Sequence, residues 1–270
     1  MIAPRVQDYR PFLAVLASLI ALCWLTLVVW DQSPYGAYLD HRLLGEGGSA
    51  LDREYAGLAV LFIAGWTLMT VAMMLPTVIP LLLLFRRLVA GRADARVLVA
   101  WLVAAYLAVW VLVGAAAHAG DLGVHTLVGR SHWLEERSGM LGVLVLVLAG
   151  AYQFTPLKRL CLDACRSPYA FIVAHWHGGN AKLDALRLGL HHGLFCVGCC
   201  WSLMLLMFAL GAGSVLWMLT LGAVMATEKN LPWGWRLSTP LGILLLAAGA
   251  ALLFAQLTAG VACAHGGATC

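Results

Sequence analysis

Apolar segments long enough to cross a lipid bilayer recur along this chain, and they constrain its fold more than any other feature. A membrane-spanning helix needs about 20 predominantly apolar residues. Only 11% of the 270 residues are charged, against about 25% in soluble domains. We therefore predict an all-α fold, a polytopic transmembrane helix bundle of about seven spans in which residues 1–270 form a single membrane domain. The predicted spans are residues 11–30, 57–85, 97–118, 139–154, 188–210, 213–228 and 239–260.

The distribution of positive charge predicts the orientation of this bundle. With a cytoplasmic N-terminus, the inner segments carry 13 of the 17 Lys and Arg residues. Such an excess is typical of cytoplasmic loops, so we expect the C-terminus outside and a multi-pass protein of a bacterial-type inner (plasma) membrane. The net charge of +4 then reflects topology. The expected partner is the lipid bilayer, and no basic and aromatic surface indicates nucleic acid.

The fifth segment carries a stripe of soft metal ligands, in the sequence HHGLFCVGCCWSLMLLM from His191 to Met207. At 3.6 residues per turn, a histidine, two cysteines and two methionines recur on one helix face, and a third cysteine lies beside it. Imidazole, thiolate and thioether together favour a soft transition metal, copper as Cu(I) first and zinc second. The predicted metal ligands here are His192, Cys196, Cys199, Cys200, Met204 and Met207.

Two other interpretations of these cysteines stay open. Buried cysteines are often small hydrophobic packing residues. The spacing Cys196-x-x-Cys199 also brings two sulfurs to neighbouring helix positions, where they could act as a redox pair.

The second segment offers two further candidate ligands, Met73 and Met74, just before Pro76 and Pro80. Each proline removes a helical hydrogen bond, and opened helices at mid-membrane often surround binding sites. The two methionines fall at about the depth of the cysteines in the fifth segment, so segments two and five are predicted to pack together. The alternative is that these methionines only fill the core.

The inner connection holds secondary metal candidates, Cys161, Cys165, His175 and His177. Together they could form a Cys2His2 zinc or copper site, although their spacing matches no standard zinc finger. Residues 157–165 could form a short interfacial helix whose basic side chains face anionic headgroups.

Glu228 and Lys229 end the sixth segment. Lys229 is expected to extend toward the membrane surface as an interfacial anchor. The alternative places the Glu228 carboxylate at the mouth of the metal site. Histidines of the outer side (His41, His118, His125, His132 and His265) and Cys263 and Cys270 of the tail could add an outer metal site or a disulfide.

Five sequence blocks carry a family resemblance: Met73-Met74-Leu75-Pro76, Tyr152-Gln153-x-Thr155-Pro156-Leu157-Lys158, Cys165-Arg166-Ser167-Pro168, Gly193-Leu194-x-Cys196-x-Gly198-Cys199-Cys200-Trp201 and Glu228-Lys229. Residues 57–255 resemble the DUF2182 family of predicted metal-binding integral membrane proteins. The resemblance implies metal binding and leaves the reaction or cargo open.

We predict an integral membrane metal-binding protein that binds Cu(I) for transport, delivery or assembly of a copper enzyme. A metal donor or acceptor, or a membrane enzyme, is the expected partner, and an oligomer is possible. The chain has no P-loop, so any transport is passive, coupled or driven by a partner, and a non-enzymatic role is favoured. The first alternative is a membrane thiol–disulfide oxidoreductase using Cys196 and Cys199. The second is a structural subunit of a membrane complex.

Overall fold

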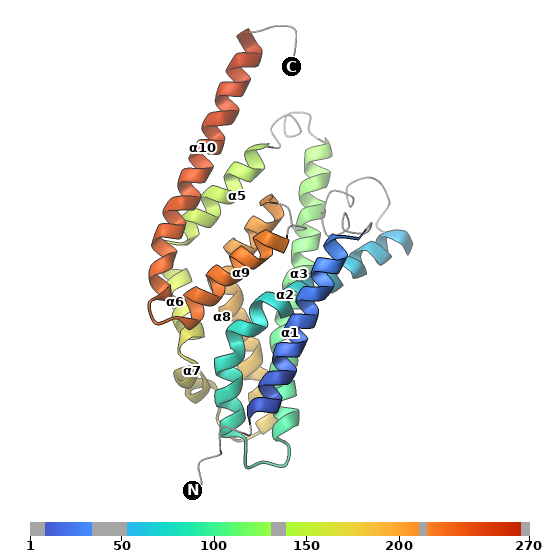
Figure 1. Cartoon of the computed structure of the whole chain (residues 1–270), viewed down its shortest axis with the longest axis vertical. Coiled ribbons are helices and arrows are strands. Elements are labelled where there is room, and N and C mark those ends of the chain that lie inside the picture. Colours follow the sequence, from blue (N-terminus) through green and yellow to red (C-terminus); the bar gives the residue numbers. More distant parts are fainter. Residues whose placement is uncertain (1–8, 34–52, 131–138, 211–214, 266–270) are drawn as a thin grey trace.

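Helices form the fold throughout the described part of the chain, as its apolar segments predict (Figure 1). The computed structural model describes residues 9–33, 53–130, 139–210 and 215–265, and no strand occurs within them. The all-α prediction is confirmed. The elements are α1 (Arg10–Asp31), α2 (Arg53–Leu88), α3 (Ala95–Arg130), α5 (Gly139–Tyr152), α6 (Pro156–Arg166), α7 (Pro168–His175), α8 (Ala181–Leu210), α9 (Val215–Asn230), the 3-10 helix η4 (Gly234–Leu237) and α10 (Ser238–His265).

Five of these helices are long and apolar enough to cross a bilayer, and a sixth span results if α5 and α6, bent by 64°, are taken together. The helix α5 has 14 residues and α9 has 16. At 1.5 Å per residue both are shorter than the roughly 30 Å hydrocarbon core. The count of seven spans and the sides of the two termini stay predictions. The five long spans are Arg10–Asp31, Ala59–Leu88, Ala95–Gly129, Ala181–Met207 and Gly234–Thr258.

The helix α8 lies at the centre of the contacts, against α3, α5, α6 and α9, while α2 packs on α1, α3 and α9. Two glycines one turn apart, Gly189 and Gly193, let α8 approach α3 closely. A Cβ atom at Gly189 would collide with the backbone carbonyl of Leu102. Small residues at such positions allow membrane helices to bring their backbones together.

The prolines of α2 do not end this helix, which continues through Pro76 and Pro80 and changes direction along its length in Figure 1. The prolines leave the carbonyls of Ala72 and Pro76 without their usual helical N–H partners. The Thr77 hydroxyl donates a hydrogen bond of 2.7 Å to the carbonyl of Met74, and Met74 lies in the buried interior.

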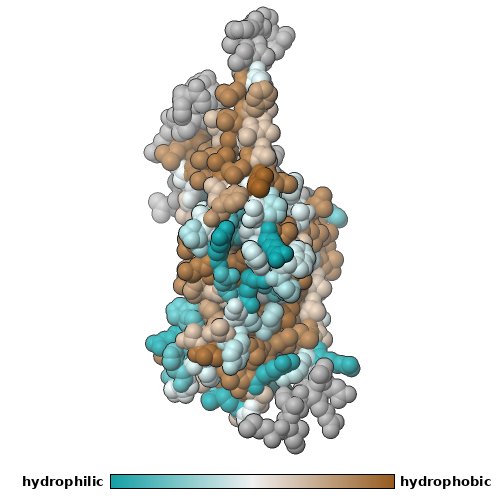
Figure 2. Space-filling model, turned by 90° about the vertical axis from the view of Figure 1, so that its left-hand side faces the viewer, coloured by the Kyte–Doolittle hydropathy of each residue, from teal (hydrophilic) through white to brown (hydrophobic). Residues whose placement is uncertain are grey.

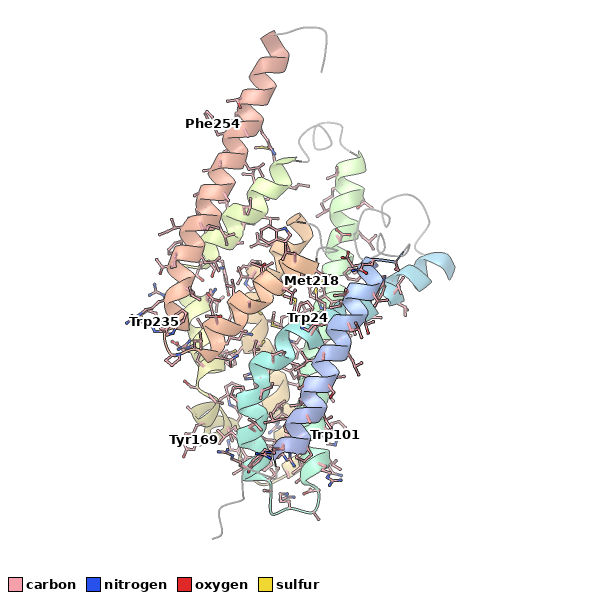
Figure 3. The ribbon with its side chains drawn as sticks, in the orientation of Figure 1. Trp24, Trp101, Tyr169, Met218, Trp235 and Phe254 are labelled. Atoms are coloured by element: carbon pink, nitrogen blue, oxygen red, sulfur yellow. The ribbon has the colours of Figure 1, made fainter. Side chains whose placement is uncertain are left out.

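The outer surface of the bundle is largely apolar. Figure 2 shows brown, hydrophobic side chains above and below a group of hydrophilic ones on one face. Phe254 of α10 and Leu112 of α3 are exposed to solvent in the isolated chain, and Figure 3 shows Phe254, Trp101, Tyr169 and Trp235 toward the periphery. Such a surface suits contact with lipid, since apolar patches of this extent are rare on soluble monomers.

Candidate metal centre

Sulfur atoms from three helices converge beside the middle of α8. The Sγ atoms of Cys165 in α6 and Cys199 in α8 are 3.8 Å apart. The Sγ atom of Cys200 lies 3.9 Å from Sδ of Met74 in α2, and Cys196 lies one helical turn before Cys199 and Cys200, whose thiols reach its carbonyl. We call Cys165, Cys196, Cys199, Cys200 and Met74 the sulfur cluster.

The local geometry of α8 gathers three of these sulfurs. The thiols of Cys199 and Cys200 both donate to the carbonyl of Cys196, at 3.1 and 2.8 Å, because residues three and four positions apart share a helix face. All three cysteines are buried. Gly198 between them lets α6 approach, since a Cβ atom there would meet Sγ of Cys161.

Lys229 brings a positive charge into the cluster. Its Nζ atom lies 2.9 Å from Sγ of Cys196 and 3.8 Å from Sδ of Met74, and Lys229 is buried. The interpretation of Lys229 as an anchor that extends to the membrane surface is wrong. A buried ammonium group is costly unless a group of opposite charge lies beside it. A cysteine thiolate would be such a group.

A buried ion pair joins α6 to the end of α9. Lys158 and Glu228 are buried, with Nζ at 2.9 and 3.0 Å from the two carboxylate oxygens. Lys158 also donates to the Gln153 side chain, and the Ser238 hydroxyl donates to Glu228 at 2.8 Å. The helix α6 forms as predicted, capped by Thr155, but Lys158 does not face lipid headgroups.

Arg166, at the C-terminal end of α6, binds the backbone at and just beyond the end of α9. Its guanidinium donates to the carbonyl of Glu228 and, at 2.8 Å, to that of Pro232. Together with the ion pair, this contact fixes the C-terminal turn of α9, and Lys229 on that turn is directed toward the thiols. The Glu228 carboxylate pairs with Lys158 and does not join the sulfur cluster.

His192 and Tyr106 line the side of the cluster toward α7. The Tyr106 hydroxyl lies 3.1 Å from Sγ of Cys196. His192 is buried, one helical turn before Cys196, with its ring 6.0 Å from that of Tyr106 between centroids. Its Nδ1 atom has no hydrogen-bond partner in the described structure, so it is available to a ligand.

The remaining predicted ligands, Met73, Met204 and Met207, are also buried. Met73 packs over Gly222 of α9. Met204 and Met207 are buried in the core, about one and two turns beyond Cys200. Contact between segments two and five is present where Met74 meets Cys200, whereas α2 packs chiefly on α1, α3 and α9.

The four secondary candidates divide between two places. Cys165 joins the sulfur cluster and Cys161 packs on Gly198. His175 instead pairs with His191, at 4.8 Å between ring centroids, and His177 is exposed. The predicted Cys2His2 site is therefore not assembled from these side chains.

Among the histidines predicted to lie outside, His118 stacks its ring on Phe62 at 5.0 Å between centroids. Residues 41, 132 and 270 lie outside the described part of the chain, as do the side chains of residues 125, 263 and 265.

In the described residues, no three His, Cys, Asp or Glu side chains are grouped in an arrangement ready to hold a metal ion. The ligand roles above thus stay predictions. Sequence reasoning missed Lys229 as a partner of Cys196, Tyr106, and the ion pair of Lys158 with Glu228. Both lysines lie just beyond the ends of the predicted spans 139–154 and 213–228, where a lysine ordinarily serves as an interfacial anchor, and nothing in the sequence singled out Tyr106.

Comparison with known families identifies the family of this chain. The sequence pattern of PpoB2, described as a copper chaperone, matches residues 63–252. This chain belongs to the PpoB2 copper chaperone family. The match runs from α2 into α10 and includes every residue of the sulfur cluster, so membership supports a copper-related function and association with copper, and gives no support to zinc. Comparisons with curated proteins and with solved structures found no match. The DUF2182 name stays a prediction.

Proposed function

We propose that this protein is an integral membrane chaperone that holds Cu(I) within its helix bundle and delivers it for assembly of a copper enzyme. The observation that carries the proposal is the convergence of four thiols and a thioether from three helices. Soft sulfur ligands select Cu(I) over harder cations. A metal donor on one side and a copper-accepting enzyme on the other would be its partners.

The spacing of the sulfurs suits one shared metal ion. Two sulfurs at the roughly 2.3 Å of zinc–thiolate bonds lie about 3.8 Å apart on a tetrahedral ion, and about 4.6 Å apart on an ion with two ligands in line. The separation between Cys165 and Cys199 is 3.8 Å and that between Cys200 and Met74 is 3.9 Å. Only small side-chain movements would be needed to bring two or three of these sulfurs to one Cu(I).

The charges of the site also suit Cu(I). A copper(I) ion held by two thiolates carries one net negative charge, which is costly in a low-dielectric interior. Lys229 supplies one positive charge next to Cys196, so the loaded site would be neutral. Lys229 would remain as counter-charge while the sulfurs hold and release the metal.

A second candidate function is thiol–disulfide exchange, and the pair Cys165 and Cys199 favours it. These free thiols come from different helices, and closing their 3.8 Å gap to the roughly 2.05 Å of a disulfide needs a small shift. Oxidation would release two protons and two electrons to a quinone acceptor. The Cys196 and Cys199 pair is less suited, because the Cys199 thiol donates to the Cys196 carbonyl, whereas the Cys196 sulfur contacts Lys229 and Tyr106.

Replacing Cys165, Cys196, Cys199 and Cys200 by serine tests the proposal. We expect loss of tight, sulfur-coordinated Cu(I) binding, because a serine oxygen is a hard, protonated group. Cu(I) is titrated anaerobically into the purified full chain in detergent against a Cu(I)-specific chelator. In the unsubstituted protein, binding should release protons and weaken as pH falls, because thiols must lose protons to bind metal.

The matched controls are Cys23→Ser in α1 and Cys161→Ser in α6, which replace buried cysteines outside the cluster. Both should keep the copper stoichiometry. Unchanged Cu(I) affinity in the fourfold serine protein would contradict the proposal. Absence of copper binding by the unsubstituted protein, together with a trapped Cys165–Cys199 disulfide, would instead favour the exchange function.

A further inference from the structure

Two histidines meet at the contact between α7 and α8, away from the sulfur cluster. His175 is the last residue of α7 and His191 lies in α8, with ring centroids 4.8 Å apart. His175 is half-buried and His191 is exposed. The helix α7 lies toward the lower end of the molecule in Figure 1, the same end at which α1 begins. The charge distribution predicts this end to be cytoplasmic.

The hydrogen bond of His175 prepares its ring for a metal. Its Nδ1 atom lies 2.9 Å from the backbone carbonyl of Phe171. A carbonyl only accepts, so Nδ1 carries the proton and, in the neutral ring, Nε2 keeps its lone pair. Histidines that bind metals commonly donate their other ring N–H to such an acceptor, which fixes the tautomer and orients the ring.

A chain of ring contacts leads from this pair to the sulfur cluster. The Phe171 ring stacks on His175 at 4.4 Å and meets the His192 ring edge-on at 5.2 Å. His192 is buried with Nδ1 unpartnered, and Cys196 follows one turn later. The polar groups thus lie in the order surface histidine pair, buried histidine, thiol.

We propose that His175 and His191 form a shallow docking site for Cu(I), from which the ion passes by His192 to the sulfur cluster. The inference rests on the proposed copper function and adds its point of entry. Two imidazoles can hold Cu(I), but thiolates are the softer ligands, so transfer inward would be favourable. The copper stays Cu(I) throughout, and only ligands are exchanged.

The first test measures the rate at which the sulfur cluster loads. Cu(I) is supplied as a complex with a weak thiol carrier to the detergent-solubilised full chain, and thiolate–copper absorption is followed by stopped flow. The double variant H175A/H191A should load about tenfold more slowly or worse, yet reach the same final thiolate–copper absorption. His177→Ala, which removes an exposed histidine two residues from His175, should load at the unsubstituted rate.

The second test isolates the docking pair. In the fourfold serine protein, one weakly held Cu(I) should remain with nitrogen and no sulfur neighbours in X-ray absorption, and H175A should remove it. Unsubstituted loading rates in H175A/H191A, or no nitrogen-bound copper in the serine protein, would overturn the docking site while leaving the sulfur cluster intact. If the unsubstituted chain binds no Cu(I) at all, the proposed function itself is wrong.

Discussion

At the scale of single residues, Cys196 is the point at which three helices act on one thiol. The Tyr106 hydroxyl of α3 and the Lys229 ammonium of α9 lie at 3.1 and 2.9 Å from its sulfur. Both groups can donate to a thiolate, and neither is a metal ligand when charged or protonated. Cys196 therefore has its electrostatic partners in place before any metal arrives, which reduces the reorganisation that binding would require.

Removal of the Lys229 charge should weaken copper binding without removing a ligand. For Lys229→Met, which keeps the length of the side chain, we expect Cu(I) affinity to fall by about tenfold or more, about 1.4 kcal/mol. The reason is that an anionic thiolate–copper complex would lose its buried counter-charge. Chelator competition measures the change, and Lys182→Met, at an exposed position of α8, is the control. Equal affinities in the two variants would exclude a charge-balancing role.

At the scale of elements, the sequence predicted the long helices but not all of their ends. The fifth segment was expected from residue 188, whereas α8 begins at Ala181. Asn180 caps the helix, since its side-chain oxygen accepts from the amide of Leu183 at 3.2 Å. Hydropathy marks only the apolar part of a helix, so the polar residues at the start of α8 were not included in the predicted segment.

The pairing of the charged residues could not be predicted from the sequence for a different reason. A lysine at the end of an apolar segment either extends to water or pairs internally, and local sequence looks the same in both cases. The outcome depends on which groups other helices present. Because Lys158 of α6 pairs with Glu228, Lys229 is left to contact Cys196. The contact of Cys165 with the sulfur cluster could not be predicted for a similar reason, because it depends on how α6 packs against α8.

The ion pair between α6 and α9 should behave as a coupled unit. Lys158→Met or Glu228→Gln alone should each lower the free energy of unfolding by about 3–5 kcal/mol, because one buried charge is left unpaired. The double variant should lose less than the two single effects combined. Denaturant unfolding in mixed micelles measures the cycle, with the exposed Asp163→Asn of α6 as control. Strict additivity would mean that the two side chains do not stabilise each other.

At the scale of the whole molecule, the proposed histidine docking site and the sulfur cluster lie at different levels of the helix bundle. The helix α1 begins at the lower end of Figure 1, and α10 ends at the upper end. The histidine pair lies on the α7 side, whereas the sulfur cluster lies about half-way along α8, at Cys196 about 22 Å from Ala181. A copper ion held there, as proposed, would be enclosed by the bundle, since Cys196, Cys199 and Cys200 are buried, and its release would need a movement of the surrounding side chains or helices.

The side of the membrane reached by the C-terminus tests how many times the chain crosses. Five or seven crossings put the two termini on opposite sides, and six put them on the same side. The described helices allow five spans, or six if α5 and α6 form one, whereas the distribution of Lys and Arg predicts seven with the C-terminus outside. The short α9 decides between these counts, since it crosses only if the bilayer thins or the helix end is buried in protein.

A reporter active only outside the cytoplasm, fused after Cys270, should therefore be active, and the same reporter fused within the connection between α2 and α3, at Gly91, should be inactive. Gly91 is exposed and flanked by Arg87, Arg92 and Arg96, and such basic connections stay cytoplasmic. A third fusion after residue 212, between α8 and α9, should also be active if α9 returns the chain to the cytoplasm before α10. An inactive reporter after Cys270 with an active one after residue 212 would show that the chain crosses six times, and that α9 and α10 do not each span the membrane.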